Sequence, residues 1–94
     1  MATPPIHPGD ILAEELSEIG VTAAELARQI QVPANRISQI INGRRRVSGD
    51  TALRLGHWFG TSAQFWLNLQ SAFDLEVAEA AVGAKVSHLP RRAA

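Results

Sequence analysis

Residues 22–46 read TAAELARQIQVPANRISQIINGRRR, and this stretch decides the fold of the chain. Thr22 followed three residues later by Glu25 is a capping box, which predicts that a helix begins there. Leu26 and Ile30 give this helix one apolar side, because residues at i and i+4 share a helix face. The pattern then breaks for two residues and resumes in a second periodic segment. The stretch therefore predicts two short helices joined by a tight turn.

The second of these helices has one apolar and one polar side. Pro33 suits its first turn, because the N–H that proline lacks would have no intrahelical partner there. Three isoleucines cluster on one side, and Gly43 follows the last helical residue. The opposite stripe and its flanks carry polar side chains, namely Asn35, Arg36, Ser38, Gln39 and Asn42. Amides on such a stripe can pair with adenine edges, and arginine can pair with guanine.

This arrangement is what a helix-turn-helix requires, with the first helix across the DNA backbone and the second in the major groove. We expect bases to be read by Asn35, Arg36, Ser38 and Gln39. We expect phosphates to be held by Thr22, Ala23, Asn42, Arg44, Arg45 and Arg46. Thr22 and Ala23 would act mainly through backbone N–H groups at the start of their helix. The alternative is a plain helical hairpin whose polar stripe faces water.

The helix-turn-helix resembles that of the lambda-repressor-like family, also called the Xre family. The residues that carry the resemblance are Glu25-Leu26-Ala27, Val32, Ile37-Ser38, Ile40, Asn42-Gly43 and the basic run after them. The chain departs from the family at the turn, where a glycine is usual and this chain has Gln31. A left-handed glutamine costs roughly 1 kcal/mol, which a packed core can absorb.

Composition limits the remaining possibilities. The chain has 94 residues, enough for one domain, and 46% of them are hydrophobic. It has no cysteines, which excludes disulfides and thiol chemistry. No signal peptide and no apolar run of transmembrane length are visible, so we expect a soluble, cytoplasmic protein with no membrane partner.

The formal net charge is zero, but the charges are unevenly distributed along the chain. A first group is acidic and consists of Asp10, Glu14, Glu15, Glu18 and Glu25. A second group is basic and consists of Arg28, Arg36, Arg44, Arg45, Arg46 and Arg54, with only Asp50 among them. Such asymmetry allows one basic face and one acidic face, which is compatible with binding to nucleic acid.

An enzyme is not indicated. His7, His57 and His88 are far apart and lack the spacing of metal ligands. No glycine-rich phosphate loop follows a strand pattern, and nothing places a serine, a histidine and an aspartate as a catalytic set. We therefore expect no catalytic residues, no metal and no cofactor.

The rest of the chain completes an all-α, five-helix domain of the lambda-repressor-like type. Residues 1–7 are expected to form a flexible arm, residues 8–82 the helical domain, and residues 83–94 a loose tail. A first helix is predicted from Pro8 to Ile19, where Gly20 stops it. Ser48 caps a fourth helix that ends at Gly60. A fifth helix follows the Thr61-Ser62 cap and ends near Val82-Gly83.

The fifth helix carries more apolar side chains than one narrow stripe can hold. One side can cover the core of the domain, and the remainder requires another partner. We predict a homodimer through Trp66, Leu69 and Phe73, with the core of the monomer as the alternative place for some of them. Two recognition helices would then meet a palindromic operator about one DNA turn apart.

Segments along the whole chain resemble the HigA branch of the Xre family. They are His7–Leu12, Ile41–Arg45, Asp50–Leu55, and Phe59–Ser62 followed by Phe65–Gln70, within a pattern that spans roughly residues 7–78. The resemblance implies an antitoxin of a type II toxin–antitoxin module. Such proteins are typically homodimers that repress their own operon and neutralise HigB, an mRNA-cleaving toxin of the RelE-like fold. The alternatives are a stand-alone Xre-type regulator without a toxin, or a purely protein-binding helical module.

A toxin that cleaves mRNA must attract phosphates, so its active face should be positive. Carboxylates would cover such a face best. We therefore place the toxin contact on Asp10, Glu14, Glu15 and Glu18, away from the predicted recognition helix. The fifth helix is a rival site, and a merely solvated helix face is the alternative for the carboxylates.

Overall fold

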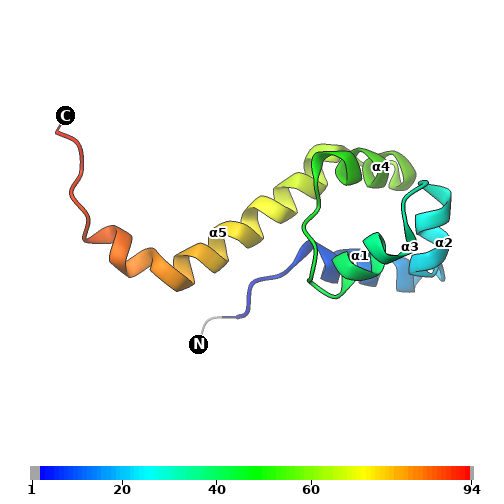
Figure 1. Ribbon diagram of the computed structural model, residues 1–94, viewed down its shortest axis with the longest axis horizontal. Helices are drawn as coiled ribbons and strands as arrows, with labels where there is room; N and C mark the ends of the chain where they lie inside the picture. The colour runs from blue at the N-terminus through cyan, green and yellow to red at the C-terminus, as the bar shows by residue number, and fades with distance from the viewer. Residues whose placement is uncertain (1–2, 94) are drawn as a thin grey trace.

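The structure, a computed structural model, describes residues 3–93. Within that range it contains five helices and no strand: α1 (Pro8–Ile19), α2 (Ala23–Gln29), α3 (Ala34–Ile41), α4 (Gly49–Phe59) and α5 (Ala63–Ser87). The predicted all-α, five-helix fold is confirmed. Helices α1 to α4 gather at one end, and α5 runs outward from them along the long axis (Figure 1). The molecule is elongated, with extents of 52 × 30 × 20 Å.

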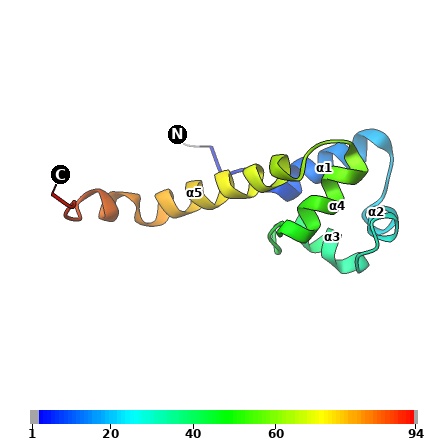
Figure 2. The ribbon, with the colours of Figure 1, turned by 90° about the horizontal axis from the view of Figure 1, so that it is seen from above.

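We call α1–α4 together with residues 63–74 of α5 the head, and residues 75–87 the arm. Buried side chains from all five helices form one core in the head: Leu12, Leu16, Leu26, Ala27, Ile30, Val32, Ile37, Ile40, Val47, Ala52, Leu55 and Trp66. The arm projects beyond this core as an uninterrupted helix (Figure 2). No helix in the described part of the chain has both the length and the apolar character needed to cross a membrane.

Helix α1 begins with a capping box that sequence reasoning did not identify. The Nδ1 atom of His7 accepts a hydrogen bond from the Gly9 N–H at 2.9 Å, and Asp10 accepts one from the His7 N–H at 3.2 Å. The His7 ring is buried and lies edge-on to Phe73, with ring centroids 4.8 Å apart. The predicted flexibility of residues 1–7 is therefore wrong at His7. Met1 and Ala2, which also belong to that prediction, lie outside the described residues.

The turn between α2 and α3 has the predicted strained residue. Gln31 has φ of 59°, in the left-handed region that side chains rarely adopt. Val32 then donates its N–H to the Ala27 carbonyl at 3.0 Å, which closes the turn. Pro33 lies one position before the first turn of α3, as its N-cap. The short turn fixes α3 against α2, which is the geometry a helix-turn-helix needs.

Helices α4 and α5 meet at Gly56. A Cβ atom on Gly56 would lie 2.7 Å from the Ala63 nitrogen and 2.8 Å from the Ser62 carbonyl carbon. Both are backbone atoms, so no side-chain rotation could relieve the overlap. The start of α5 is therefore pressed directly onto α4.

The three predicted dimer residues all belong to the head. Trp66 is 1% exposed and packs in the core beside Phe59, with ring centroids 5.5 Å apart. Its assignment to a dimer surface is wrong, because the side chain is already enclosed by its own chain. Leu69 and Phe73 are half-buried, the former against the core and the latter against His7.

The predicted end of the fifth helix is also wrong. Helix α5 passes through Gly83 and ends at Ser87, so the predicted loose tail from residue 83 begins five residues too early. One glycine costs an exposed helix only about 1 kcal/mol, which favourable neighbours can offset. The continuation gives the arm a further turn of helix.

Candidate DNA-binding surface

Helix α3 presents the two sides that its sequence predicts. Ile37 and Ile40 are fully buried against the head, and Asn35 and Asn42 are exposed on the other side. Gln39 lies between these two asparagines on the helix and is half-buried. The three amides therefore share one accessible stripe, the predicted position for contact with bases.

Gln39 is oriented by the basic loop after α3. The Arg45 Nε–H donates a hydrogen bond to Gln39 Oε1 over 3.0 Å. This bond occupies the amide oxygen and leaves the Gln39 NH₂ group pointing elsewhere as a donor. Sequence reasoning assigned these two residues to separate tasks, whereas the structure joins them.

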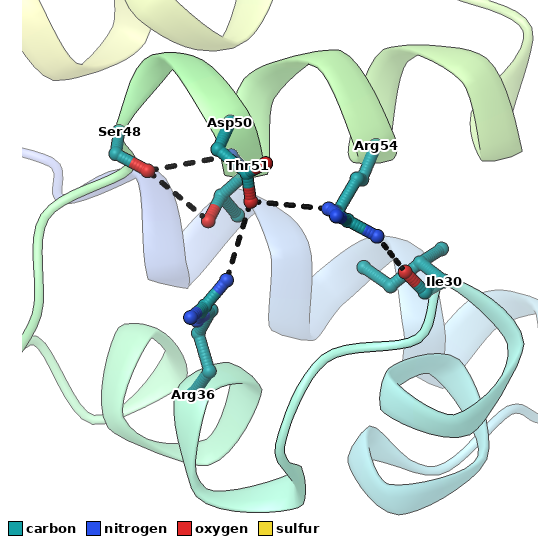
Figure 3. A network of polar contacts seen from close by, with 6 residues as sticks. All are labelled: Ile30, Arg36, Ser48, Asp50, Thr51 and Arg54. Carbon is teal, nitrogen blue, oxygen red and sulfur yellow. Dashed lines mark hydrogen bonds and ion pairs between the residues drawn. The ribbon is translucent and has the colours of Figure 1, made fainter.

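Arg36 and Ser38, the other predicted base readers, are less accessible. The Arg36 guanidinium turns from the amide stripe toward α4, where its Nη1 lies 3.3 Å from Asp50 Oδ2. Figure 3 shows Arg36 and Arg54 converging on Asp50 from two helices. The Ser38 hydroxyl donates to the Asn35 carbonyl within α3 at 3.2 Å. Both side chains therefore have partners inside the protein.

The three arginines after α3 are exposed, and one of them is tied to α5. Arg46 Nη1 lies 2.8 Å from Asp74 Oδ2. The buried Gln70 accepts a hydrogen bond from the Val47 N–H at 2.8 Å and donates another to Asp74 at 3.0 Å. The hydrogen bond from Gln70 and the bond from Arg46 lower the pKa of Asp74 below its usual 3.8.

Gln70 and Asp74 were missed by sequence reasoning, although they fasten the basic loop to the head. Their only signal in the sequence was polar spacing at i and i+4, which Gln64 and Asn68 on the same helix share. Because Gln70 is 3% exposed, its amide must find partners inside the protein, and the loop backbone provides one. The loop that carries Arg44, Arg45 and Arg46 is thus held at its C-terminal end.

Thr22 and Ala23 stand at the start of α2, as predicted. The Thr22 hydroxyl accepts a hydrogen bond from the Glu25 N–H at 3.1 Å. The Glu25 carboxylate, however, does not return to the cap, because it bonds to Gln29 at 2.8 Å and pairs with Arg28. These bonds, first that from Gln29 and then that from Arg28, lower the pKa of Glu25. The phosphate contacts of Thr22 and Ala23 stay a prediction.

The predicted acidic face is present on α1, but its carboxylates differ in whether they are already hydrogen-bonded within the chain. Asp10 is engaged in the capping box with His7. Glu14, Glu15 and Glu18 are exposed. Asp10 is exposed as well, but its carboxylate is engaged by the His7 N–H, so the three glutamates remain as the part of the face without that bond.

A hollow of about 320 Å³ lies beside the helix-turn-helix, lined by Gln29, Ile30, Gln31, Leu53, Arg54, His57 and Trp58. Several of its polar groups are used within the protein, since Trp58 donates to Gln29 at 2.7 Å and Arg54 to the Ile30 carbonyl at 2.7 Å. Across residues 3–93, no group of three or more His, Asp or Glu side chains could hold a metal ion. The exposed amides and arginines around α3 are the better candidate site.

Residues 12–66 match the model of the helix-turn-helix family. The chain is 49% identical to virulence-associated protein I of Dichelobacter nodosus over 77 residues, which are 81% of this chain and 71% of that protein. A HigA-family addiction module antidote protein from Coxiella burnetii has a similar structure, with a TM-score of 0.91 and 44% identity over 96% of this chain and 100% of that one.

A second solved structure, Pseudomonas aeruginosa antitoxin HigA with the higBA promoter, gives a TM-score of 0.90. It is 45% identical, and the match covers 96% of this chain and 99% of that one. Both structures match the arm as well as the head, because nearly the whole of each chain is covered. The chain therefore belongs to the helix-turn-helix family of DNA-binding regulators and, within it, to the HigA branch.

Proposed function

We propose that this protein is the antitoxin of a type II toxin–antitoxin module and represses its own operon by binding operator DNA. The observation that carries the proposal is the exposed amide stripe of α3 beside three exposed arginines. It lies on a chain that matches a promoter-bound HigA antitoxin over nearly its full length. Because its target is DNA in the cell interior, we expect the protein in the cytoplasm, acting by binding and not by catalysis.

On this proposal, Asn35 and Gln39 read base edges and Arg44 and Arg45 neutralise phosphates. The support for the first pair is their place on the accessible stripe of α3. The support for the second pair is their exposure in the loop directly after α3. Phosphate contacts set position and affinity, while base contacts set sequence preference.

The test is binding to the DNA upstream of the gene, measured by fluorescence anisotropy at several salt concentrations. Replacing Gln39 by Ala should cost about 1–3 kcal/mol of binding free energy and relax the preference at one base pair. Replacing Arg44 by Ala should weaken all sequences alike and reduce the slope against log salt by about 0.9. Arg45→Ala should do both, because Arg45 also holds Gln39.

Arg91→Ala is the matched control for charge, since Arg91 is exposed and belongs to the segment after α5, which lies at the end of the molecule away from α3 (Figure 1). It should leave the salt slope unchanged. If Gln39→Ala and Arg44→Ala both bound the operator like the parent, α3 would not be the recognition helix. The purely protein-binding module would then be the better description.

A homodimer is the second part of the proposal. One recognition helix touches only a few base pairs, so specific binding normally requires two, about 34 Å apart. The arm offers an apolar stripe at heptad-like spacing, with Leu75 61%, Val82 46% and Val86 54% exposed. A second copy of the arm would cover this stripe, which monomers rarely leave open.

Light scattering at micromolar concentration should give twice the monomer mass. Replacing both Val82 and Val86 by Glu should produce monomers and weaken operator binding at least tenfold. Ala80→Glu, on the opposite side of the arm, is the control and should leave the dimer intact. A parent that is monomeric and still binds a palindrome tightly would exclude this dimer.

Neutralisation of a basic, mRNA-cleaving toxin is the third part of the proposal, and it rests on charge complementarity. Glu14, Glu15 and Glu18 are exposed on α1. Their reversal to Lys should abolish neutralisation of the small protein encoded by the neighbouring gene, while DNA binding stays. The matched reversal of Glu76 and Glu79 tests α5 as the rival site. If the parent bound no neighbouring protein, a stand-alone repressor would remain.

A further inference from the structure

Arg36 occupies an unusual position for a base-reading arginine. It follows Asn35 on α3, yet its side chain is only 29% exposed and lies against α4. Its Nη1 atom is 3.3 Å from Asp50 Oδ2, which belongs to the first turn of α4. A guanidinium that reads guanine must present two N–H groups to the base edge. In this orientation at least one of its nitrogens is directed at a carboxylate of the protein.

The partner of Arg36 is itself fixed from a second side. The same Oδ2 atom of Asp50 accepts a hydrogen bond from Arg54 Nε at 3.0 Å, one turn further along α4. Arg54 in turn donates through Nη1 to the Ile30 carbonyl at 2.7 Å, where α2 ends. Figure 3 shows these contacts as one chain from α2 through α4 to α3. Asp50 is thus held in place by Arg54 and can hold Arg36.

The start of α4 further restricts where Asp50 can lie. Ser48 is the N-cap of α4, and its hydroxyl accepts a hydrogen bond from the Thr51 N–H at 3.3 Å. The carboxylate of Asp50 in the first turn is favoured by the positive end of the helix. The helix start and the two neighbouring guanidinium groups therefore both hold the Asp50 side chain in its observed place.

The charges in this cluster do not cancel. One carboxylate faces two guanidinium groups, so the cluster carries a net positive charge beside the recognition helix. A phosphate that approached Arg36 would have to displace or tolerate the carboxylate of Asp50, which is 57% exposed. The carboxylate thus lowers the attraction of this corner for DNA and competes with bases for the Arg36 guanidinium.

We propose that Asp50 is a specificity-determining residue that keeps Arg36 off the bases and the phosphates of the DNA, so that Arg36 positions α3 against α4 and the amides read the sequence. The inference rests on the proposed DNA-binding function and deepens it, because it assigns a role to an acidic residue at the edge of the DNA-binding surface. Removal of the Asp50 charge releases Arg36 toward the DNA and adds an interaction that the parent lacks.

The test is a double-mutant cycle of Asp50→Asn and Arg36→Gln, measured by anisotropy on the operator duplex and on a scrambled duplex. Asn keeps the shape of Asp and removes its charge, and Asp50→Ser provides a second variant should the first fail to fold. In the parent, Arg36→Gln should reduce operator affinity by less than threefold, because it removes a partly exposed ion pair that positions α3 and no contact with DNA. In the Asp50→Asn background, the same change should reduce affinity at least tenfold.

Asp50→Asn alone should tighten binding to both duplexes and narrow the ratio between them. It should also increase the salt slope by about 0.9, the contribution of one further phosphate contact. Loss of a repulsive charge alone would tighten binding equally with or without Arg36, so only non-additivity in the cycle supports the release of Arg36. Side-chain NMR of Arg36 provides a readout without DNA, and the guanidinium N–H signals should exchange faster in Asp50→Asn.

Two results would overturn the inference. The first is an additive cycle, in which Arg36→Gln has the same effect in both backgrounds. The second is a tenfold loss of operator affinity for Arg36→Gln in the parent, with preference lost at a single guanine. Failure of the parent to distinguish the operator from the scrambled duplex is a separate result that rejects the proposed function, and with it the role of Asp50.

Discussion

The head and the arm use the same kinds of side chain in opposite ways. In the head, Leu12 and Leu55 are fully buried by contacts within one chain. In the arm, Leu75 and Val86 are 61% and 54% exposed, although they lie on a regular helix. Burial of apolar surface is the main favourable term in folding. The head therefore gains this term from its own contacts, whereas in the proposed dimer the arm would gain it from a second chain.

The boundary between these regions falls within α5. Trp66 fills the core, Gln70 accepts a hydrogen bond from the loop backbone, and Asp74 pairs with Arg46. At the next residue, Leu75, the helix has left the head. The helix that carries the proposed dimer contact is thus the same helix that fastens the basic loop. A partner bound to the arm would therefore also restrict the motion of the basic loop of Arg44, Arg45 and Arg46.

The largest effect is expected from truncating a buried side chain in the part of α5 that belongs to the head. Trp66→Ala removes a large buried side chain, so the free energy of unfolding should fall by about 3–5 kcal/mol. Leu75→Ala makes a similar kind of change on the arm, where little is buried within one chain. At concentrations low enough to keep the protein monomeric, it should change stability by less than about 0.5 kcal/mol. Urea unfolding followed by circular dichroism measures both.

The opposite ranking would place the boundary elsewhere. If Trp66→Ala folded as stably as the parent but lost its dimer, Trp66 would belong to the interface as the sequence suggested. If Leu75→Ala were strongly destabilising in the monomer, the arm would fold back onto the head in solution.

Much of the head could be predicted because its signals are local. The caps Thr22, Ser48 and Ser62 each accept the hydrogen bond expected of them. Gly20 and Gly60 end their helices with φ of 70° and 73°. Caps and left-handed residues depend on neighbours within one turn, so a single sequence contains the information.

The division of α5 into a part that packs in the head and an exposed arm could not be predicted in the same way. Its apolar residues cover more than half of the helix circumference, so periodicity does not say which side meets the core. Trp66 and Phe73 therefore looked equivalent to the exposed residues further along. Gly83 looked like a helix end because glycine is a common stop, but nothing beyond it forbids helix.

The individual roles within the site were equally hidden. Arg36, Arg45 and Arg46 look alike in sequence as basic residues near α3. Their differences come from partners at other positions, since Asp50 is 14 residues from Arg36 and Asp74 lies on another helix. Gln39 and Arg45 are six residues apart and meet only because the loop turns back. Such pairings follow from tertiary packing and leave no local pattern.

The second prediction compares two glycines in helices. Gly56→Ala would push a Cβ against the backbone of Ser62 and Ala63, so α4 and α5 must move apart. We expect a loss of about 1–3 kcal/mol in the free energy of unfolding. Gly83→Ala meets only the Glu79 Cβ at 3.7 Å, which is ordinary contact. It should stabilise the arm by about 0.5–1 kcal/mol through better helix propensity.

Thermal unfolding and helix content by circular dichroism measure this pair of variants. Gly56→Ala with unchanged stability would mean that the contact between α4 and α5 is looser than the structure has it. Gly83→Ala with reduced dimer mass would mean that a partner chain packs closely on Gly83. That second result would show that the arm, like the head at Gly56, has a tight interface.

The smallest effect is expected at the boundary itself, from the pH dependence of the pair between Arg46 and Asp74. The hydrogen bond from Gln70 and the bond from Arg46 lower the pKa of Asp74 below 3.8. A carboxyl group with a lowered pKa in the folded state stabilises that state above its unfolded pKa, and this contribution is lost as pH falls through the folded pKa.

Asp74→Asn should therefore unfold slightly more easily than the parent from pH 5 to pH 7. The difference should shrink once the pH falls below 3.8 and vanish below the lowered pKa of Asp74, where the carboxyl is protonated in both states. Because the pair is solvent-exposed, the difference should stay within about 1 kcal/mol. Urea unfolding at pH 7, 5 and 3 measures it, and a difference that persisted unchanged at pH 3 would show that Asp74 acts by packing and not by charge.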